Sequence, residues 1–351
     1  MIPVAAPSPI DPQPELWRRV SHVVSRTASV EALRHHGVHL MAAADRHARG
    51  LPVADDLHAD ELRAALLTLS APTLLRRVRS AYDGRLLLIK GPELAACYPR
   101  PQLRPFIDLD LLTDDPGAAH CALRSAGFIE VGVSAAYTGA HHLRPLAWPQ
   151  LPLTIELHRT LNHPSWLAPP PSRELLELTR PSATGVDGLL GLLPAAHAIV
   201  IALHSWAHQP LRRLLDLVDI MMVLEPSDRA EAGRLARRWG SHRVWRTTLS
   251  AAVSLLEEGS RAFTLSTWAR HLAEVRERTV LETHLARWAG AGSGLPRTGL
   301  RSIGGATVLF TDAMRPRSGE SWSDALGRTR LAMSNAFRPQ SEHDDMKLRS
   351  E

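Results

Sequence analysis

Asp108 and Asp110 stand two residues apart in the otherwise apolar segment 106–112 (FIDLDLL), a spacing that could bind metal ions. On a strand, such residues project from the same face, so their carboxylates would lie close enough to share divalent cations. An isolated Asp-x-Asp on a surface strand is more often a solvated edge. Here the neighbours are apolar, and half-burying two carboxylates is costly unless a cation offsets their charge. The pair therefore predicts a metal site, with Leu109 and Leu111 directed into the core.

A third carboxylate, Glu156, lies in a later segment. Apolar and polar residues alternate through 153–161, which predicts a strand whose outward face carries Glu156. Three acidic groups from neighbouring strands could hold two metal ions for in-line displacement at phosphorus. The alternative is an ordinary glutamate on the polar face of a sheet.

Lys90 and Gly91 follow a short apolar run and precede Pro92, the pattern of a strand, a glycine turn and a helix. Gly91 would let the backbone approach a phosphate closely, and the helix start would present free N–H groups. The chain has 39 arginines but only two lysines, Lys90 and Lys347. A compact ammonium suits phosphate oxygens in a tight loop, so Lys90 invites a functional interpretation, with chance placement as the alternative.

Other polar residues could support this site. Arg104 could clamp a phosphate or pair with an acidic neighbour, and the clamp is our prediction. His204 and His208 are four apart, so they would share a helix face at zinc-ligand spacing. Ser205 stands where a zinc protease carries its catalytic glutamate, which argues against protease chemistry. We interpret the two histidines as residues of a helical packing face, hydrogen-bonded to their neighbours.

The elements expected to position these residues define an α+β fold, a small mixed β-sheet core flanked by helices. Strands are predicted over 85–90, 107–112, 128–133, 141–148 and 153–161, and helices over 92–98 and 116–126. Helices are predicted before this core and again after residue 171, including 194–224, 228–239, 244–257 and 324–336. The expected units are a disordered leader (1–14), an N-terminal helical region (15–84), the core (85–168), a C-terminal helical region (169–340) and a polar tail (341–351). The pairs His35-His36 and His141-His142 are interpreted as surface residues.

Composition and charge argue against several classes of protein. Cys97 and Cys121 are the only cysteines, too few for a disulfide framework, a zinc cluster or an iron–sulfur cluster. The most apolar stretch, 186–203, is interrupted by polar residues and proline, which predicts a buried helix instead of a membrane span. Residues 1–17 fit neither a secretory signal nor a transit peptide, which predicts a cytoplasmic protein. The net charge of +5 is scattered and gives weak support for nucleic-acid binding.

An ordered set of short motifs resembles the bacterial nucleotidyltransferase-like family of the polymerase-beta superfamily. The motifs are LIKG (88–91), YP (98–99), LRPFIDLDLL (103–112), GF (127–128), IELH (155–158), HSWAH (204–208) and LLD (214–216). Each motif alone is weak, but the set in this order is specific. The resemblance covers residues 85–225.

The resemblance implies metal-dependent transfer of a nucleoside monophosphate from a nucleoside triphosphate, with release of pyrophosphate. It implies that Asp108 and Asp110 bind two Mg²⁺ ions, that Glu156 binds the ion that activates the acceptor hydroxyl, and that the triphosphate rests on the Gly91 turn. Mn²⁺ could replace Mg²⁺, and ATP is the expected triphosphate. The resemblance also implies a supporting role near the site for His158, His204 and His208, with Asp216 as a partner of the last two. The wider superfamily carries Gly-Ser or Gly-Gly at this turn, whereas here Lys90-Gly91 precedes Pro92, a departure in the loop expected to contact phosphate.

The acceptor is not determined by the sequence. A hydroxyl or phosphate of a small molecule, a peptide or a natural-product precursor is favoured. A toxin that modifies tRNA by the same chemistry is one alternative, a phosphotransferase is another, and a catalytically silent nucleotide-binding protein is a third. No membrane partner is expected, and the oligomeric state is left open.

Overall fold

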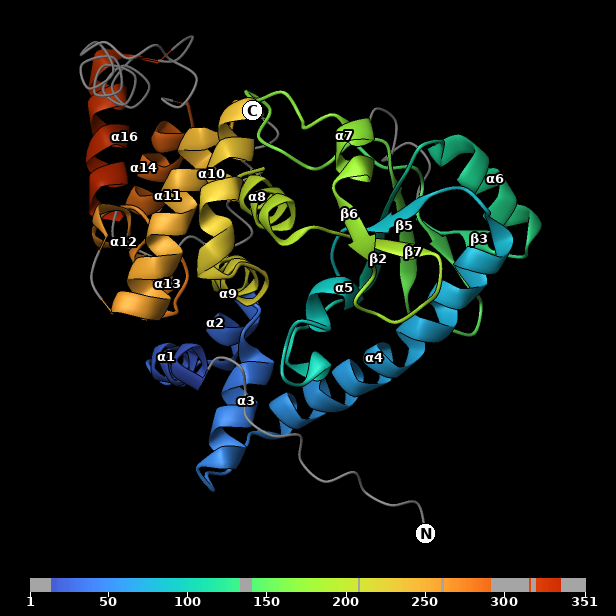
Figure 1. Cartoon of the computed structure of the whole chain (residues 1–351). Helices are drawn as coiled ribbons and strands as arrows, with labels where there is room; N and C mark the ends of the chain where they lie inside the picture. Colours follow the sequence, from blue (N-terminus) through green and yellow to red (C-terminus); the bar gives the residue numbers. More distant parts are fainter. Residues whose placement is uncertain are drawn as a thin grey trace.

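A seven-stranded mixed β-sheet and a set of helices make up the fold, which confirms the α+β prediction (Figure 1). The computed structural model describes residues 14–132, 141–207, 209–259, 262–291, 316 and 320–335. The predicted leader, apart from Pro14, and the predicted polar tail lie outside these residues. The domain boundaries given above stay predictions.

Helices precede the sheet, as predicted. They are α1 (Pro14–Val24), α2 (Val30–His35), α3 (His39–Ala48) and α4 (Asp55–Ala81). The long α4 runs past the sheet and joins it to the cluster formed by α1, α2 and α3 (Figure 1). Leu74, Leu75 and Val78 of α4 are fully buried against apolar side chains of the strands. This packing fixes one face of the sheet as a hydrophobic core.

The strands lie in the order β3-β4-β5-β2-β1-β7-β6. Their bounds are β1 (Leu86–Leu88), β2 (Asp108–Thr113), β3 (Ile129–Glu130), β4 (Leu146–Ala147), β5 (Thr154–His158), β6 (Thr179–Pro181) and β7 (Leu189–Leu192). The central strand β2 is antiparallel to β1 and parallel to β5. Leu109 and Leu111 of β2 are buried in the core shared with α4 and with α6 (Pro116–Ser125), as predicted. Side chains alternate along a strand, so Asp108 and Asp110 face the opposite side.

The prediction that the chain returns to helices after residue 171 was wrong for β6 and β7, which come before α8. β7 pairs in parallel with β1, and β6 pairs with β7 in antiparallel fashion. The apolar run 186–203 therefore divides into β7 and most of helix α8 (Pro194–His204), and does not form one buried helix. Gly191 of β7 packs on the carboxylate of Glu93, and any side chain there would overlap Glu93 Oε1.

Glu93 lies in the short helix α5 (Pro92–Ala95), which directly follows the Lys90-Gly91 turn. Its buried carboxylate accepts hydrogen bonds from Ser182 Oγ at 2.5 Å and from the Ala183 amide at 2.9 Å. Arg180 adds an ion pair at 3.0 Å. Burial raises the pKa of Glu93 from its ordinary value, although these partners oppose the shift. The unpredicted hairpin therefore holds the turn that follows β1.

Helices make up most of the later part of the chain. They include α7 (Ser172–Glu177), α9 (Leu214–Val223), α10 (Arg229–Arg238), α11 (His242–Val253), α12 (Phe263–Ser266), α13 (Arg270–Glu274), α14 (Val280–Ala291) and α16 (Trp322–Asn335). The helix predicted over 194–224 is two helices, α8 and α9, because the chain turns between them and Leu211 adopts a φ of +53°. Among the helices described, none combines the length and apolar content needed to cross a membrane.

Candidate active site

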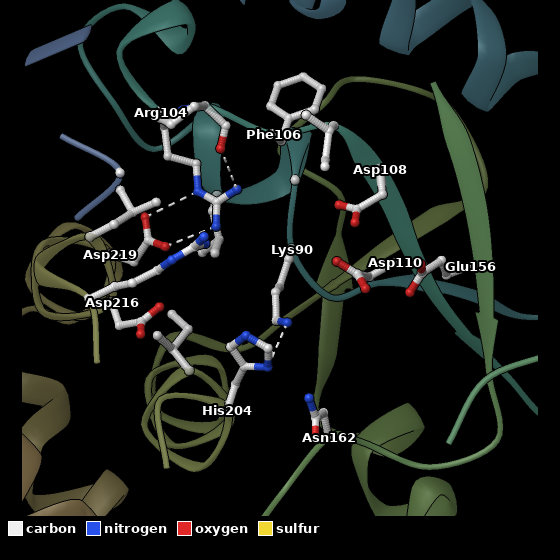
Figure 2. A pocket seen from close by; sticks show the side chains of 18 of the residues that line it. Lys90, Arg104, Phe106, Asp108, Asp110, Glu156, Asn162, His204, Asp216 and Asp219 are labelled. Carbon is white, nitrogen blue, oxygen red and sulfur yellow. Dashed lines mark hydrogen bonds and ion pairs between the residues drawn. The ribbon is translucent and has the colours of Figure 1, made fainter. Parts of the chain in front are cut away.

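One pocket, with a volume of about 410 Å³, gathers the predicted site residues (Figure 2). The size falls within the range of small-molecule sites. The residues that line it include Lys90, Gly91, Arg104, Asp108, Asp110, Glu156, His158, His204 and Asp216. His208 lies outside the described residues. One wall is the polar face of the sheet, and the facing wall comes from α8 and α9 (Figure 2).

The carboxylates come together because of the register between β2 and β5. Asp110 is the direct partner of Glu156, and Asp108 is the partner of Thr154. Directly paired residues of neighbouring strands point to the same face, so Glu156 projects beside Asp110 (Figure 2). The three acidic groups thus converge from two adjacent strands that pair in parallel.

The two aspartates have opposite pKa shifts. Burial, together with the charges of Asp110 and Glu156, raises the pKa of Asp108 to about 6. Burial acts in the same direction on Asp110, but the Lys90 charge and the hydrogen bond from His158 outweigh it and hold the pKa of Asp110 well below its ordinary value. Carboxylates this close resist joint ionisation unless a cation is shared between them. The electrostatics therefore favour a bound cation at this wall.

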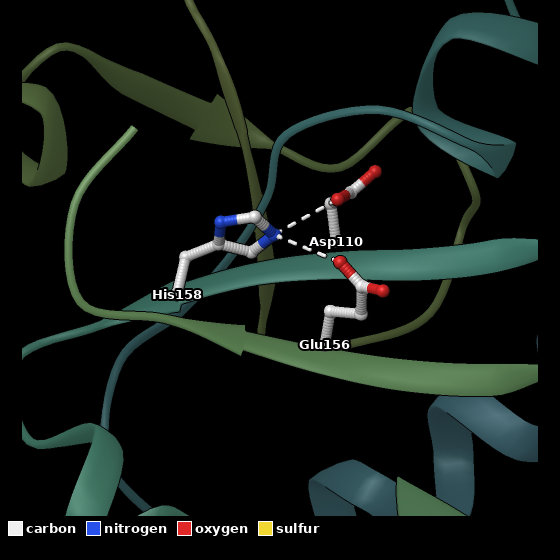
Figure 3. A group of neighbouring side chains, drawn as sticks. All are labelled: Asp110, Glu156 and His158. Carbon is white, nitrogen blue, oxygen red and sulfur yellow. Dashed lines mark hydrogen bonds and ion pairs between the residues drawn. The ribbon is translucent and has the colours of Figure 1, made fainter. Parts of the chain in front are cut away.

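The donor chemistry also fits a divalent cation. Ligand atoms of Asp110, Glu156 and His158 all lie within 4.8 Å of one another. Nε2 of His158 donates to Asp110 Oδ1 at 2.8 Å and lies 3.8 Å from Glu156 Oε2 (Figure 3). Two carboxylates and an imidazole are common ligands of divalent metals. Residues Asp108, Asp110, Glu156 and His158 can thus hold the metal that the sequence predicts.

Lys90 lies between the carboxylates and the helical wall (Figure 2). Its ammonium Nζ donates a hydrogen bond to Nδ1 of His204, the last residue of α8, at 2.8 Å. His197 lies about two turns earlier on α8. Its Nε2 is 2.7 Å from the carbonyl oxygen of Ile89. These two contacts fasten α8 to the end of β1. They fix where the lysine charge lies.

Gly91 has the backbone that the glycine turn requires. Its φ of +57° is in the region that favours glycine. A Cβ atom at this position would lie 2.8 Å from the backbone oxygen of Asp108. The turn therefore passes directly against the start of β2, which brings Lys90 next to the aspartates.

Arg104 is buried and forms a two-point ion pair with Asp219 of α9. Nε and Nη2 of the guanidinium donate to the two Asp219 oxygens at 3.2 and 3.0 Å, and Tyr98 donates its hydroxyl to the same carboxylate at 2.6 Å. The sequence interpretation left pairing with an acidic neighbour as the alternative, and this pairing is observed. Binding of phosphate by Arg104 stays a prediction. Asp216 lies one turn before Asp219, and burial together with the Asp219 charge raises the pKa of Asp216 to about 6.

Two histidines interpreted as surface residues are buried. His36 is fully buried, with Nε2 2.8 Å from the carbonyl oxygen of Arg276. His142 is buried in the pocket wall, with Nε2 3.5 Å from Glu156 Oε2. The two histidine pairs carry no pattern in the sequence that predicts burial of His36 and His142.

The sequence analysis did not predict Asp219 as a residue of the site. It lies in the apolar run of α9, where a buried carboxylate requires a partner. That requirement was the signal in the sequence that could have identified it.

Comparison with known proteins gives one match. Residues 24–257, most of the chain, match the sequence profile of a family described as "Uncharacterised nucleotidyltransferase". No curated protein and no solved structure matches the chain. The matched range includes both walls of the pocket.

Proposed function

The chain belongs to this family of uncharacterised nucleotidyltransferases, and we propose that it moves a nucleoside monophosphate from a nucleoside triphosphate to a hydroxyl or phosphate of an acceptor. The expected triphosphate is ATP. The observation that carries the proposal is the pairing of Asp110 with Glu156 on neighbouring strands. Asp108 projects from the same face of the sheet, and Lys90 lines the same pocket. This arrangement supplies acidic metal ligands and a cationic group around one space.

Asp108, Asp110 and Glu156 would hold the divalent ions, with Mg²⁺ as the ion expected. Such ions neutralise phosphate charge and make a bound hydroxyl more acidic. The proposal is supported by the raised pKa of Asp108, because crowding of carboxylates is relieved when a cation binds. Central strands set the positions of the three carboxylates, so these side chains would need little rearrangement when the ions bind.

Lys90 would bind phosphate oxygens from the side opposite to the carboxylates. Its ammonium has three hydrogen-bond donors and His204 accepts one, so other donors can reach a ligand. Gly91 lines the same pocket, so the backbone of its turn would lie next to the triphosphate. His158 would support the metal-binding carboxylates, and His204 and Asp216 would orient Lys90 and its surroundings.

The chemistry would be displacement at the α-phosphorus. The acceptor oxygen loses its proton and bonds to that phosphorus while the bond to the bridging oxygen of pyrophosphate breaks. The protein would contribute chiefly by positioning and charge neutralisation. Among acceptors we favour a small molecule, a peptide or a natural-product precursor over tRNA, because the positive charges are scattered along the chain.

The test is incubation of the protein with Mg²⁺ and each α-labelled nucleoside triphosphate in a cell extract. Label should move to an acceptor and pyrophosphate should appear. Release of a nucleoside diphosphate with no transfer of the α-label would instead indicate phosphotransfer. Label on RNA would identify the tRNA alternative.

Asp108→Asn and Asp110→Asn should abolish label transfer in protein that stays folded. Asp114→Asn is the matched control, because Asp114 lies just beyond the end of β2, where it pairs with Arg85 outside the pocket. Full activity in both pocket variants would rule out the site. Loss in all three variants would point to a general effect on β2.

A further inference from the structure

An imidazole stands beside the carboxylates of the sheet wall. His158 lies two residues after Glu156 on β5, so both side chains project from the same face. His158 is only 4% exposed, and its Nε2 faces both Asp110 and Glu156 (Figure 3). A nitrogen donor is thus directed into the group of oxygen donors.

The separations between these donors suit a shared ion. Two ligand atoms about 2.1–2.2 Å from one metal ion, at angles between octahedral and tetrahedral, lie about 3.0–3.5 Å apart. Nε2 of His158 lies 2.8 Å from Asp110 Oδ1 and 3.8 Å from Glu156 Oε2, which brackets that range. Because the three ligand atoms lie within 4.8 Å of one another, side-chain rotations would bring them to one cation.

The proton on His158 can move to allow this. In the hydrogen bond to Asp110, Nε2 carries the proton that is donated. Among the residues described, none forms a hydrogen bond with Nδ1 of His158. The ring can carry its proton on Nδ1 and present the Nε2 lone pair to a cation. The Nδ1–H would then be a buried donor without a partner among the described residues, a cost that metal coordination must offset.

We propose that His158 is a metal ligand and that, with Asp110 and Glu156, it forms a position for a divalent transition-metal ion such as Mn²⁺ in preference to Mg²⁺. Mg²⁺ is held in proteins chiefly by oxygen ligands, whereas an imidazole suits first-row transition metals. Asp108 lies outside this trio and remains available for a second, all-oxygen position with Asp110. The two positions would then differ in the metal they prefer.

His142 is the competing source of nitrogen. Its Nε2 lies 3.5 Å from Glu156 Oε2, and its ring centre is 5.5 Å from that of His158. Nδ1 of His142 donates to the carbonyl oxygen of Leu143 at 2.7 Å, which leaves its Nε2 for a cation. That Nε2 is close to one carboxylate, whereas Nε2 of His158 is close to two. The geometry therefore assigns the ligand to His158 and makes His142 a neighbour of Glu156.

The test uses Mn²⁺ and pulsed electron paramagnetic resonance on the full chain without nucleotide. A coordinated imidazole gives a ¹⁴N modulation in the electron spin-echo envelope. We expect this modulation in the wild-type protein, and we expect its frequencies to change when the protein is made with ¹⁵N-histidine. Absence of nitrogen coupling in wild-type protein with bound Mn²⁺ would overturn the proposal, and this readout needs no variant.

Variants then identify the histidine. His158→Gln should lose the ¹⁴N modulation and should bind Mn²⁺ on the order of 10–100-fold more weakly, with a smaller change for Mg²⁺. His120→Gln is the matched control, since His120 is also buried and lies 3.6 Å from a carboxylate, that of Glu130, outside the pocket. It should keep the modulation. Loss of the modulation in His142→Gln but not in His158→Gln would refute the assignment.

This inference rests on the proposed function for its location, but its outcome is separate. If nitrogen coupling is absent while α-label still transfers with Mg²⁺, the metal ligand is wrong and the proposed reaction stands. If coupling is present but no triphosphate is consumed with either metal, the metal site stands and the proposed reaction fails.

Discussion

Replacing Asp219 by asparagine should destabilise the protein strongly, because it removes the charge that faces a buried arginine. Arg104 is 7% exposed and Asp219 is 1% exposed. An asparagine could still accept the hydrogen bond from Tyr98, so the main change is the loss of charge. Removing one partner of a buried ion pair leaves the other charge uncompensated, so we expect the free energy of unfolding to fall by about 3–5 kcal/mol.

A double variant separates the ion pair from other effects. Arg104→Met with Asp219→Asn removes both charges and fills the space of the arginine stem, so it should be more stable than Asp219→Asn alone. The chain also offers an exposed pair of the same geometry. Arg85 donates twice to Asp114, both times at 2.8 Å, and both side chains are 46% exposed. Asp114→Asn should cause no resolvable change, because water solvates the remaining charge.

The assay is urea unfolding followed by far-ultraviolet circular dichroism, with the midpoint and slope fitted for each variant. The reasoning would be refuted if Asp219→Asn and Asp114→Asn had the same midpoint. It would also fail if the double variant were as unstable as the sum of its single variants, since that would mean the two charges do not interact.

Three further predictions follow from the turn and from buried histidines. Lys90→Arg should weaken binding of a non-hydrolysable triphosphate in calorimetry, because a planar guanidinium cannot replace a compact ammonium; equal affinity would remove the argument from lysine rarity. Gly91→Ala should lower the free energy of unfolding by about 1–3 kcal/mol more than Gly50→Ala, because both have positive φ but only Gly91 also meets a backbone oxygen, and equal losses in urea would contradict this. Burial lowers the pKa of His36 and His197 to about 4. Both groups bind protons more readily when unfolded, so stability is lost as pH falls, by roughly 1.3 kcal/mol each from about pH 7.5 to about pH 5.5. Urea midpoints of His36→Gln should depend less on pH than those of the wild type, and an unchanged dependence would count against this.

Much of the site could be predicted from local patterns. The alternation around Asp108 and Asp110 placed Leu109 and Leu111 in the core, because a strand with one buried face must alternate. The strand, glycine and proline around Gly91 predicted the turn, because only a few residue types fit its backbone. Such features depend on neighbours in sequence.

Features that depend on distant residues were not predicted. Arg104 and Asp219 are 115 residues apart, so the sequence could not tell an ion pair from a phosphate clamp. β7 was interpreted as part of a helix, because a short apolar run has the same composition in either structure. In α4, the periodicity predicted a helix, but Leu62 and Leu69 are exposed, since the packing face is set by the sheet.

The place of β2 in the sheet has a consequence for motion. β2 is hydrogen-bonded on both sides, to β1 and to β5, and its apolar face is covered. Its amides should exchange with solvent among the slowest in the chain, since opening them requires disrupting the centre of the sheet. His204, in contrast, is the last residue of a single helix, α8, and its side chain is held to the sheet side by the Lys90 contact. Slow hydrogen exchange on the acidic wall and faster exchange on the histidine wall would mean that the carboxylates form a fixed frame, against which the helical side adjusts when a ligand enters.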